Sequence, residues 1–230
     1  MRFKALLTGD AEELARRTLA AEPRWILGCL GILAASCAIY GFTFGLWRGE
    51  LQATFTALKL PLVILLTCGG NALLNGCLAL VLGTNLGFRQ SSLAILMSFT
   101  LTGVILASFA PIMLFLLWNT PALGSPDSER GGSITLLAHV ALIGFAGVMG
   151  NCRLWQLIRR LTGSISKAHT VLFAWLAGNL LLGSQVSWIL RPWIGRSDAD
   201  ITFFSAHPMQ GNFFEAVWHS LTVLLKNSNL

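Results

Sequence analysis

The decisive stretch of this sequence is Gly178-Asn-Leu-Leu-Leu-Gly-Ser-Gln-Val-Ser-Trp-Ile-Leu-Arg-Pro-Trp-Ile-Gly195. Its first half is apolar enough to lie within a lipid bilayer, although single Asn and Gln side chains interrupt it. Its second half gathers amphipathic rings and a long cation, which favour lipid-headgroup depth, at Trp188, Arg191 and Trp193. Because Pro192 disfavours helical geometry at the residue before it, a membrane-spanning helix is predicted to end near Arg191.

The composition of the whole chain points to the same class of protein. Of 230 residues, 54% are hydrophobic and 11% are charged, whereas a soluble domain has about 25% charged residues. The mean hydropathy is +0.68. We therefore expect a polytopic membrane protein with little mass outside the bilayer.

Several apolar segments are long enough to cross a bilayer, which takes about 20 helical residues. They cover Trp25–Trp47, Lys59–Gly83, Ser91–Trp118, Ser133–Cys152 and Ala168–Leu190. The predicted fold class is an all-α polytopic membrane helical bundle with residues 24–190 as its transmembrane domain. Residues 48–58 are predicted to be a short amphipathic connection, and residues 153–167 a strongly basic one.

Both ends of the chain carry amphipathic helical patterns. In residues 1–23, Asp10 and Glu13 resemble a capping pair before an apolar face. This cytoplasmic segment is predicted to lie on the membrane surface or to be a solvated helix. Residues 191–230 are predicted to form an extracytoplasmic cap. Its helix, Asn212–Leu225, is short for a span, so it is expected on the outer surface or docked on the bundle, with a re-entrant segment as the alternative.

The distribution of positive charge predicts the orientation. With the N-terminus inside, the inner segments hold ten of the 16 Lys and Arg residues and the whole net charge of +6. Cytoplasmic loops carry such an excess. We expect a bacterial inner (cytoplasmic) membrane protein with a cytoplasmic N-terminus and an extracytoplasmic C-terminus.

Polar side chains within the apolar segments are the first candidate site. They are Asn71, Asn75, His139, Asn179 and Gln185. Such groups mark substrate pathways or act as hydrogen-bonding contacts between helices, worth about 0.6 kcal/mol each. No Asp, Glu, Lys or Arg is expected deep within a segment, which favours the second interpretation.

Two further sets of residues point to contacts with other membrane components. Glycines that allow close helix approach, within the bundle or to another protein, are Gly69, Gly70, Gly144, Gly147 and Gly183. Residues that suit the membrane interface or a lipid headgroup are Trp188, Arg191, Trp193 and Arg196. Arg191 is expected to be a structural anchor or to bind a headgroup phosphate.

No catalytic or metal-binding signature is present in the sequence. The cysteines have no CxxC spacing, and there is no HExxH, GxSxG or phosphate-binding loop. We expect no enzymatic activity, no metal, no cofactor and no nucleic-acid partner. An enzyme embedded in the membrane, dependent on His207 or Glu215, stays an alternative.

Short motifs resemble the Yip family of polytopic membrane proteins. These are the stretches Ala57–Leu62 and Phe109–Ile112, and Gly183–Gly195 and Asn212–Glu215 resemble an uncharacterised bacterial branch. The resemblance implies a cytoplasmic N-terminal region, closely packed spans and an outward C-terminus. Eukaryotic members act in membrane traffic through partner proteins, and the resemblance supplies no catalytic residues.

The function expected from the sequence is that of a non-enzymatic membrane scaffold or accessory subunit. Its partners would be membrane lipids and other integral membrane proteins, or a second copy of the chain. The alternative is a small-molecule or ion permeation protein that uses the intramembrane polar cluster.

Overall fold

The computed structural model describes residues 5–6, 10–81, 87–193 and 200–227. These residues are helical except for short connections, and no strand occurs among them. The expected all-α helical bundle is confirmed.

Five helices are long and apolar enough to cross a membrane. They are α3 (Pro23–Gly45), α4 (Glu50–Val81), α5 (Phe88–Ser108), α7 (Ser128–Thr162) and α8 (Ile165–Ile189). The chain is therefore a multi-pass membrane protein.

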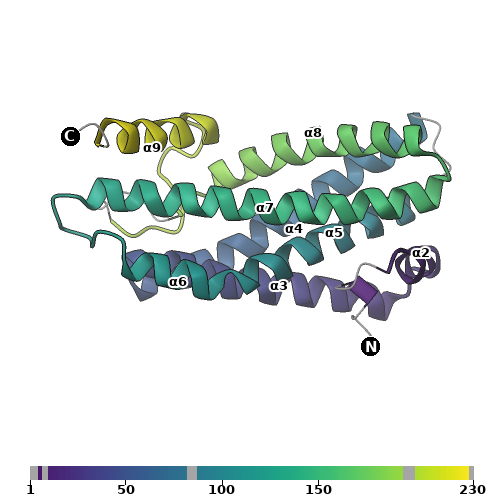
Figure 1. The fold of residues 1–230 in the computed structure, drawn as a ribbon, viewed down its shortest axis with the longest axis horizontal. Helices are drawn as coiled ribbons and strands as arrows, with labels where there is room; N and C mark the ends of the chain where they lie inside the picture. Colours follow the sequence, from purple (N-terminus) through teal and green to yellow (C-terminus); the bar gives the residue numbers. More distant parts are fainter. Residues whose placement is uncertain (1–4, 7–9, 82–86, 194–199, 228–230) are drawn as a thin grey trace.

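The long helices run back and forth along the long axis of the bundle (Figure 1). As a result, the N-terminal helix α2 (Ala11–Ala20) and the C-terminal helix α9 (Phe213–Asn227) lie at opposite ends. We call these the N-terminal end and the C-terminal end of the bundle. The N-terminal end also holds the α7–α8 connection, and the C-terminal end holds the short helix η1 (Leu46–Arg48).

The predicted connection at residues 48–58 is wrong, because α4 begins at Glu50. Gly49 takes a φ of 104°, which lets the chain turn sharply between η1 and α4. The residues that follow are already helical, so the second span starts earlier than the apolar pattern indicates. Pro61 lies inside this helix.

The predicted connection at residues 153–167 is largely wrong, because α7 continues beyond Cys152 to Thr162. It ends where Gly163 adopts the left-handed conformation with a φ of 65°. The arginines of this segment are therefore on a helix, since Arg and Lys are good helix formers whether or not they lie in the bilayer. The third span, in contrast, is broken at Phe109, just before Pro111 of α6 (Ala110–Trp118).

Close backbone contacts hold α3 against α4. A Cβ added at Gly41 would lie 2.6 Å from the backbone oxygen of Thr56. A Cβ added at Gly45 would lie 2.6 Å from the Cα of Ala53. This small-xxx-small pair lets the two helices meet without side chains between them.

The terminal helices pack onto the bundle. Asp10 accepts hydrogen bonds from the backbone amides of Glu12 and Glu13, at 3.2 Å each, and so caps α2. Leu14 and Thr18 of α2 are buried, and the helix contacts α5 and α7. Helix α9 contacts α7 and α8 at the C-terminal end. Docking on the bundle was one of the arrangements expected for α9, whereas it was not expected for α2.

Candidate functional site: a buried polar stripe on α4

A row of polar side chains follows one face of α4. Its members are Gln52, Thr56, Lys59, Thr67 and Asn71. Their spacing of three, four and eight residues keeps them on the same side of a helix. Each is at most 3% exposed. We call this row the α4 stripe. Polar groups buried in a membrane bundle are costly unless they find partners.

The first half of the α4 stripe is covered by the chain that follows α8. Lys59 donates from Nζ to the carbonyl oxygen of Pro192 at 2.8 Å. Thr56 donates from Oγ1 to the carbonyl oxygen of Trp193 at 3.1 Å. Gln52 donates from Nε2 to both of these carbonyl oxygens. The C-terminal segment is thus fastened to α4 through its backbone.

The ammonium group of Lys59 is held inside the protein. It lies 4.9 Å from the ring centroid of Phe203, which in turn packs edge-on against Phe55 at 5.2 Å. The sequence places Lys59 at the outer boundary of the second span. In the structure it lies within α4 and is fully buried against the chain that follows α8, so a charge that the sequence places at the edge of a span is enclosed by protein.

The second half of the α4 stripe faces α8. A Cβ added at Gly183 would lie 3.6 Å from Cγ2 of Thr67, and one at Gly70 would lie 3.2 Å from Cδ1 of Leu182. Helices α4 and α8 run in opposite directions (Figure 1). One turn further along each helix, this register brings Asn71 level with Asn179.

Buried polar atoms in this half have no hydrogen-bond partner among the described residues. They are Thr67 Oγ1, Asn71 Nδ2 and Oδ1, Trp175 Nε1 and Asn179 Oδ1. Each unpaired buried group costs about 1–3 kcal/mol. This interface is therefore a place where a molecule with hydrogen-bonding groups would be stabilised. Asn75 lies one turn beyond Asn71 on α4, but its side chain falls outside the described residues.

The other two members of the predicted polar cluster lie elsewhere. His139 of α7 packs against α3, with Nδ1 3.3 Å from the hydroxyl oxygen of Tyr40. Its ring also stacks on Phe44 with centroids 4.2 Å apart. Gln185 is exposed on α8 and makes no hydrogen bond with another described residue. The register thus places Asn71 and Asn179 at the same level of two facing helices, whereas His139 packs against α3 and Gln185 is exposed.

The predicted packing glycines divide into two groups. Gly70 and Gly183 lie in the α4–α8 interface described above. A Cβ added at Gly69, Gly144 or Gly147 would meet no described atom within 4 Å. The last three therefore face outward.

Arg191 joins the end of α8 to the loop before α9. Its guanidinium donates to the carbonyl oxygens of His207 (2.6 Å), Pro208 (2.9 Å), Gln210 (2.9 Å) and Trp188 (3.2 Å). It also lies 3.9 Å from the centroid of the Trp188 ring. Partial burial lowers the pKa of Arg191. Because most of its donors are occupied, the structural role explains the geometry better than a phosphate site does.

The tryptophans around Arg191 are also tied to the backbone. Trp188 donates from Nε1 to the carbonyl oxygen of Gln210 at 2.9 Å, and Trp193 donates to that of Ser187 at 3.0 Å. Arg196 lies outside the described residues. Sequence reasoning missed Gln52, Thr56 and Lys59 as a set, although their spacing was a visible signal.

Comparison with known proteins adds no further constraint. No family model, curated protein or solved structure matches this chain. The resemblance to the Yip family is not tested by these comparisons and stays a prediction.

Proposed function

We propose that the chain is a non-enzymatic integral membrane scaffold or accessory subunit. It binds a partner membrane protein through the outward face of α7 and α8. The observation that carries this proposal is the exposed amide of Gln185 on a helix that crosses the membrane.

Helix α8 is loosely covered by its own bundle. Its only buried side chains among the described residues are those of Ala168, Val171 and Trp175. Gln185 points away from the bundle and lacks a described partner. An amide that faces hydrocarbon without a hydrogen bond is costly, and a neighbouring helix with a polar group removes that cost.

The adjacent helix α7 offers a smooth surface for such a neighbour. Gly144 and Gly147 have open space where a side chain would be, and the exposed residues Phe145 and Val148 lie between and beside them. Glycines on an outward face let the backbone of another helix come close. The resemblance to a family whose eukaryotic members act through partner proteins supports the same proposal.

The test is recovery of the tagged protein in mild detergent from its own host, with mass spectrometry of associated membrane proteins. Gln185→Leu and Gly147→Leu are expected to lose the partner that the unmodified chain retains. Gly31→Leu is the matched control, because Gly31 of α3 is exposed and also has nothing within 4 Å of an added Cβ. Equal recovery of the partner by all variants would overturn the proposal.

A second candidate function is the permeation of a small polar solute. The unpartnered groups of Thr67, Asn71 and Asn179 support it, because they would hydrogen-bond to a passing molecule. In liposomes, Asn71→Leu is expected to abolish flux, whereas His139→Phe leaves it intact because His139 lies apart, on α7 against α3. Absence of flux for every solute offered would exclude this candidate.

A further inference from the structure

A cavity of about 480 Å³ lies at the N-terminal end of the bundle, between the start of α2 and the last turns of α7. The described residues that line it are Ala11, Gln156, Arg159 and Arg160. It is large enough for a small ligand, since binding pockets occupy about 300–1,000 Å³.

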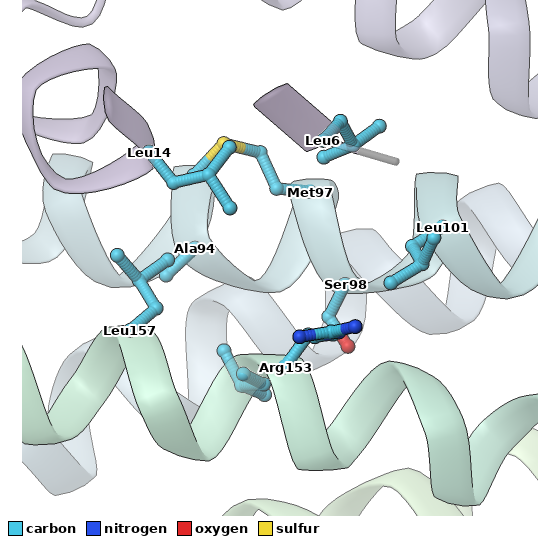
Figure 2. A pocket seen from close by; sticks show the side chains of 9 residues that line it. Leu6, Leu14, Ala94, Met97, Ser98, Leu101, Arg153 and Leu157 are labelled. Atoms are coloured by element: carbon cyan, nitrogen blue, oxygen red, sulfur yellow. The ribbon is translucent and has the colours of Figure 1, made fainter. Parts of the chain in front are cut away.

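Close packing beneath α2 holds this helix on the bundle beside the cavity. Only a gap of about 10 Å³ remains where Leu6 and Leu14 meet α5 and α7. Figure 2 shows this gap, with Arg153 reaching from α7 toward Ser98 of α5. Helix α2 is thus held in place beside the larger cavity, which is open to the outside and has exposed arginines on its α7 side.

The polar groups around the cavity are donors. Neither Arg159 nor Arg160 lies within ion-pair distance of a carboxylate among the described residues. Gln156 accepts a hydrogen bond from Arg153 at 3.2 Å through Oε1, which leaves its amide nitrogen free to donate. The site therefore favours a hydrogen-bond acceptor with negative charge.

The position of Arg159 is stabilised by aromatic rings. Its guanidinium lies 5.6 Å from the ring centroid of Trp155. Trp155 stacks in turn on His169 of α8, with centroids 5.5 Å apart. Cation–π contact of this kind restrains the cation while its N–H groups stay available.

We propose that this cavity binds the phosphodiester headgroup of an anionic glycerophospholipid. It lies at the last turns of α7, at the N-terminal end of the bundle (Figure 1), and lipid headgroups meet a membrane-spanning bundle at its ends. Basic pockets between membrane helices bind anionic headgroups, and the planar guanidinium suits phosphate oxygens. The site is separate from the outward α7–α8 face to which a partner protein is assigned, and it rests on different residues.

The test measures thermal unfolding of the purified full chain in detergent with added phosphatidylglycerol or phosphatidylcholine. Phosphatidylglycerol is expected to raise the midpoint temperature of unfolding of the unmodified chain. Phosphatidylcholine is expected to leave this temperature unchanged. The double variant Arg159→Gln, Arg160→Gln should need about 30-fold more phosphatidylglycerol than the unmodified chain to reach half of this increase. The single variant Arg160→Gln should need about fivefold more. Arg24→Gln is the control for Arg160→Gln alone, because it removes one exposed positive charge at the same end, and it should leave the response unchanged.

Three results would overturn the proposal. They are an unchanged response in the double arginine variant, an equal loss in the control variant, and equal stabilisation by inorganic phosphate at the same concentration. A cooperative unfolding transition in phosphatidylcholine shows that a variant is folded. If the double variant does not fold, the single variant Arg160→Gln provides the test. Because partner recovery is measured separately, failure of this test leaves the proposed scaffold function standing.

Discussion

The close approach of α3 and α4 makes a sharp prediction for Gly41→Ala. The added Cβ would meet the backbone oxygen of Thr56 at 2.6 Å and the Cα of Ala57 at 3.2 Å. The first contact is about 1 Å shorter than an optimal one. Because backbone cannot rotate away as a side chain can, α4 must move.

The loss of stability expected for Gly41→Ala has two sources. Overpacking a tight helix contact costs about 1–3 kcal/mol. Moving the Thr56 backbone also strains its hydrogen bond to Trp193, worth about 0.5–1.5 kcal/mol. Replacing a helical Gly by Ala recovers about 1 kcal/mol of helix propensity. Gly31→Ala on the same helix gains that propensity without a clash, because nothing lies within 4 Å.

We therefore expect the two variants to differ by about 3 kcal/mol in the free energy of unfolding, with Gly41→Ala the less stable. The assay is denaturant unfolding in a maltoside detergent, followed by helical circular dichroism. The same variant should also expose the segment after α8 to protease. Equal stability of the two variants would refute the close α3–α4 contact and with it the placement of the α4 stripe.

Three further predictions follow from single side chains. Asn71→Leu should raise the free energy of unfolding of the bundle by about 1 kcal/mol or more, because it removes two unpaired buried polar atoms. A lower free energy of unfolding in the same assay would mean that Asn71 has a hydrogen-bond partner. Arg191→Gln should lower the free energy of local unfolding at the C-terminal end by about 2 kcal/mol, because it removes charged hydrogen bonds to carbonyl oxygens. Amide exchange should then become faster in α9 and stay unchanged in α2. The neighbouring Arg16 and Arg17 lower the pKa of Glu13 from its ordinary value of 4.5. Protection of α2 amides from exchange should therefore be greatest above pH 4.5 and decrease slightly as the pH falls through the lowered pKa. Protection that is unchanged in strong acid would contradict this role.

The five spans could be predicted from the sequence because hydrocarbon thickness imposes a length of about 20 apolar residues. Their ends could not be predicted as well. At Cys152 the apolar pattern stops but the helix does not, since the arginines that follow are equally compatible with a helix. At Phe109 the helix breaks within an apolar run, and only Pro111 signals it.

The candidate site was partly visible in the sequence. Asn71 and Asn179 stand out as polar residues in apolar segments, but their meeting depends on α4 and α8 being antiparallel neighbours. No local pattern reports that arrangement. Lys59 was assigned to the end of a span because a charge usually marks one. Its spacing from Gln52 and Thr56 was the better guide to a buried polar face.

The central claim is that the outward face of α7 and α8 binds another membrane protein. The most direct measurement is photo-crosslinking in the host membrane, with a photoreactive side chain placed at position 185, 147 or 31 in turn. We predict one shared crosslinked membrane protein at positions 185 and 147, none at position 31, and loss of the product at 147 when Gln185→Leu is added. Crosslinks to lipid alone at all positions, or the same products at position 31, would contradict the account.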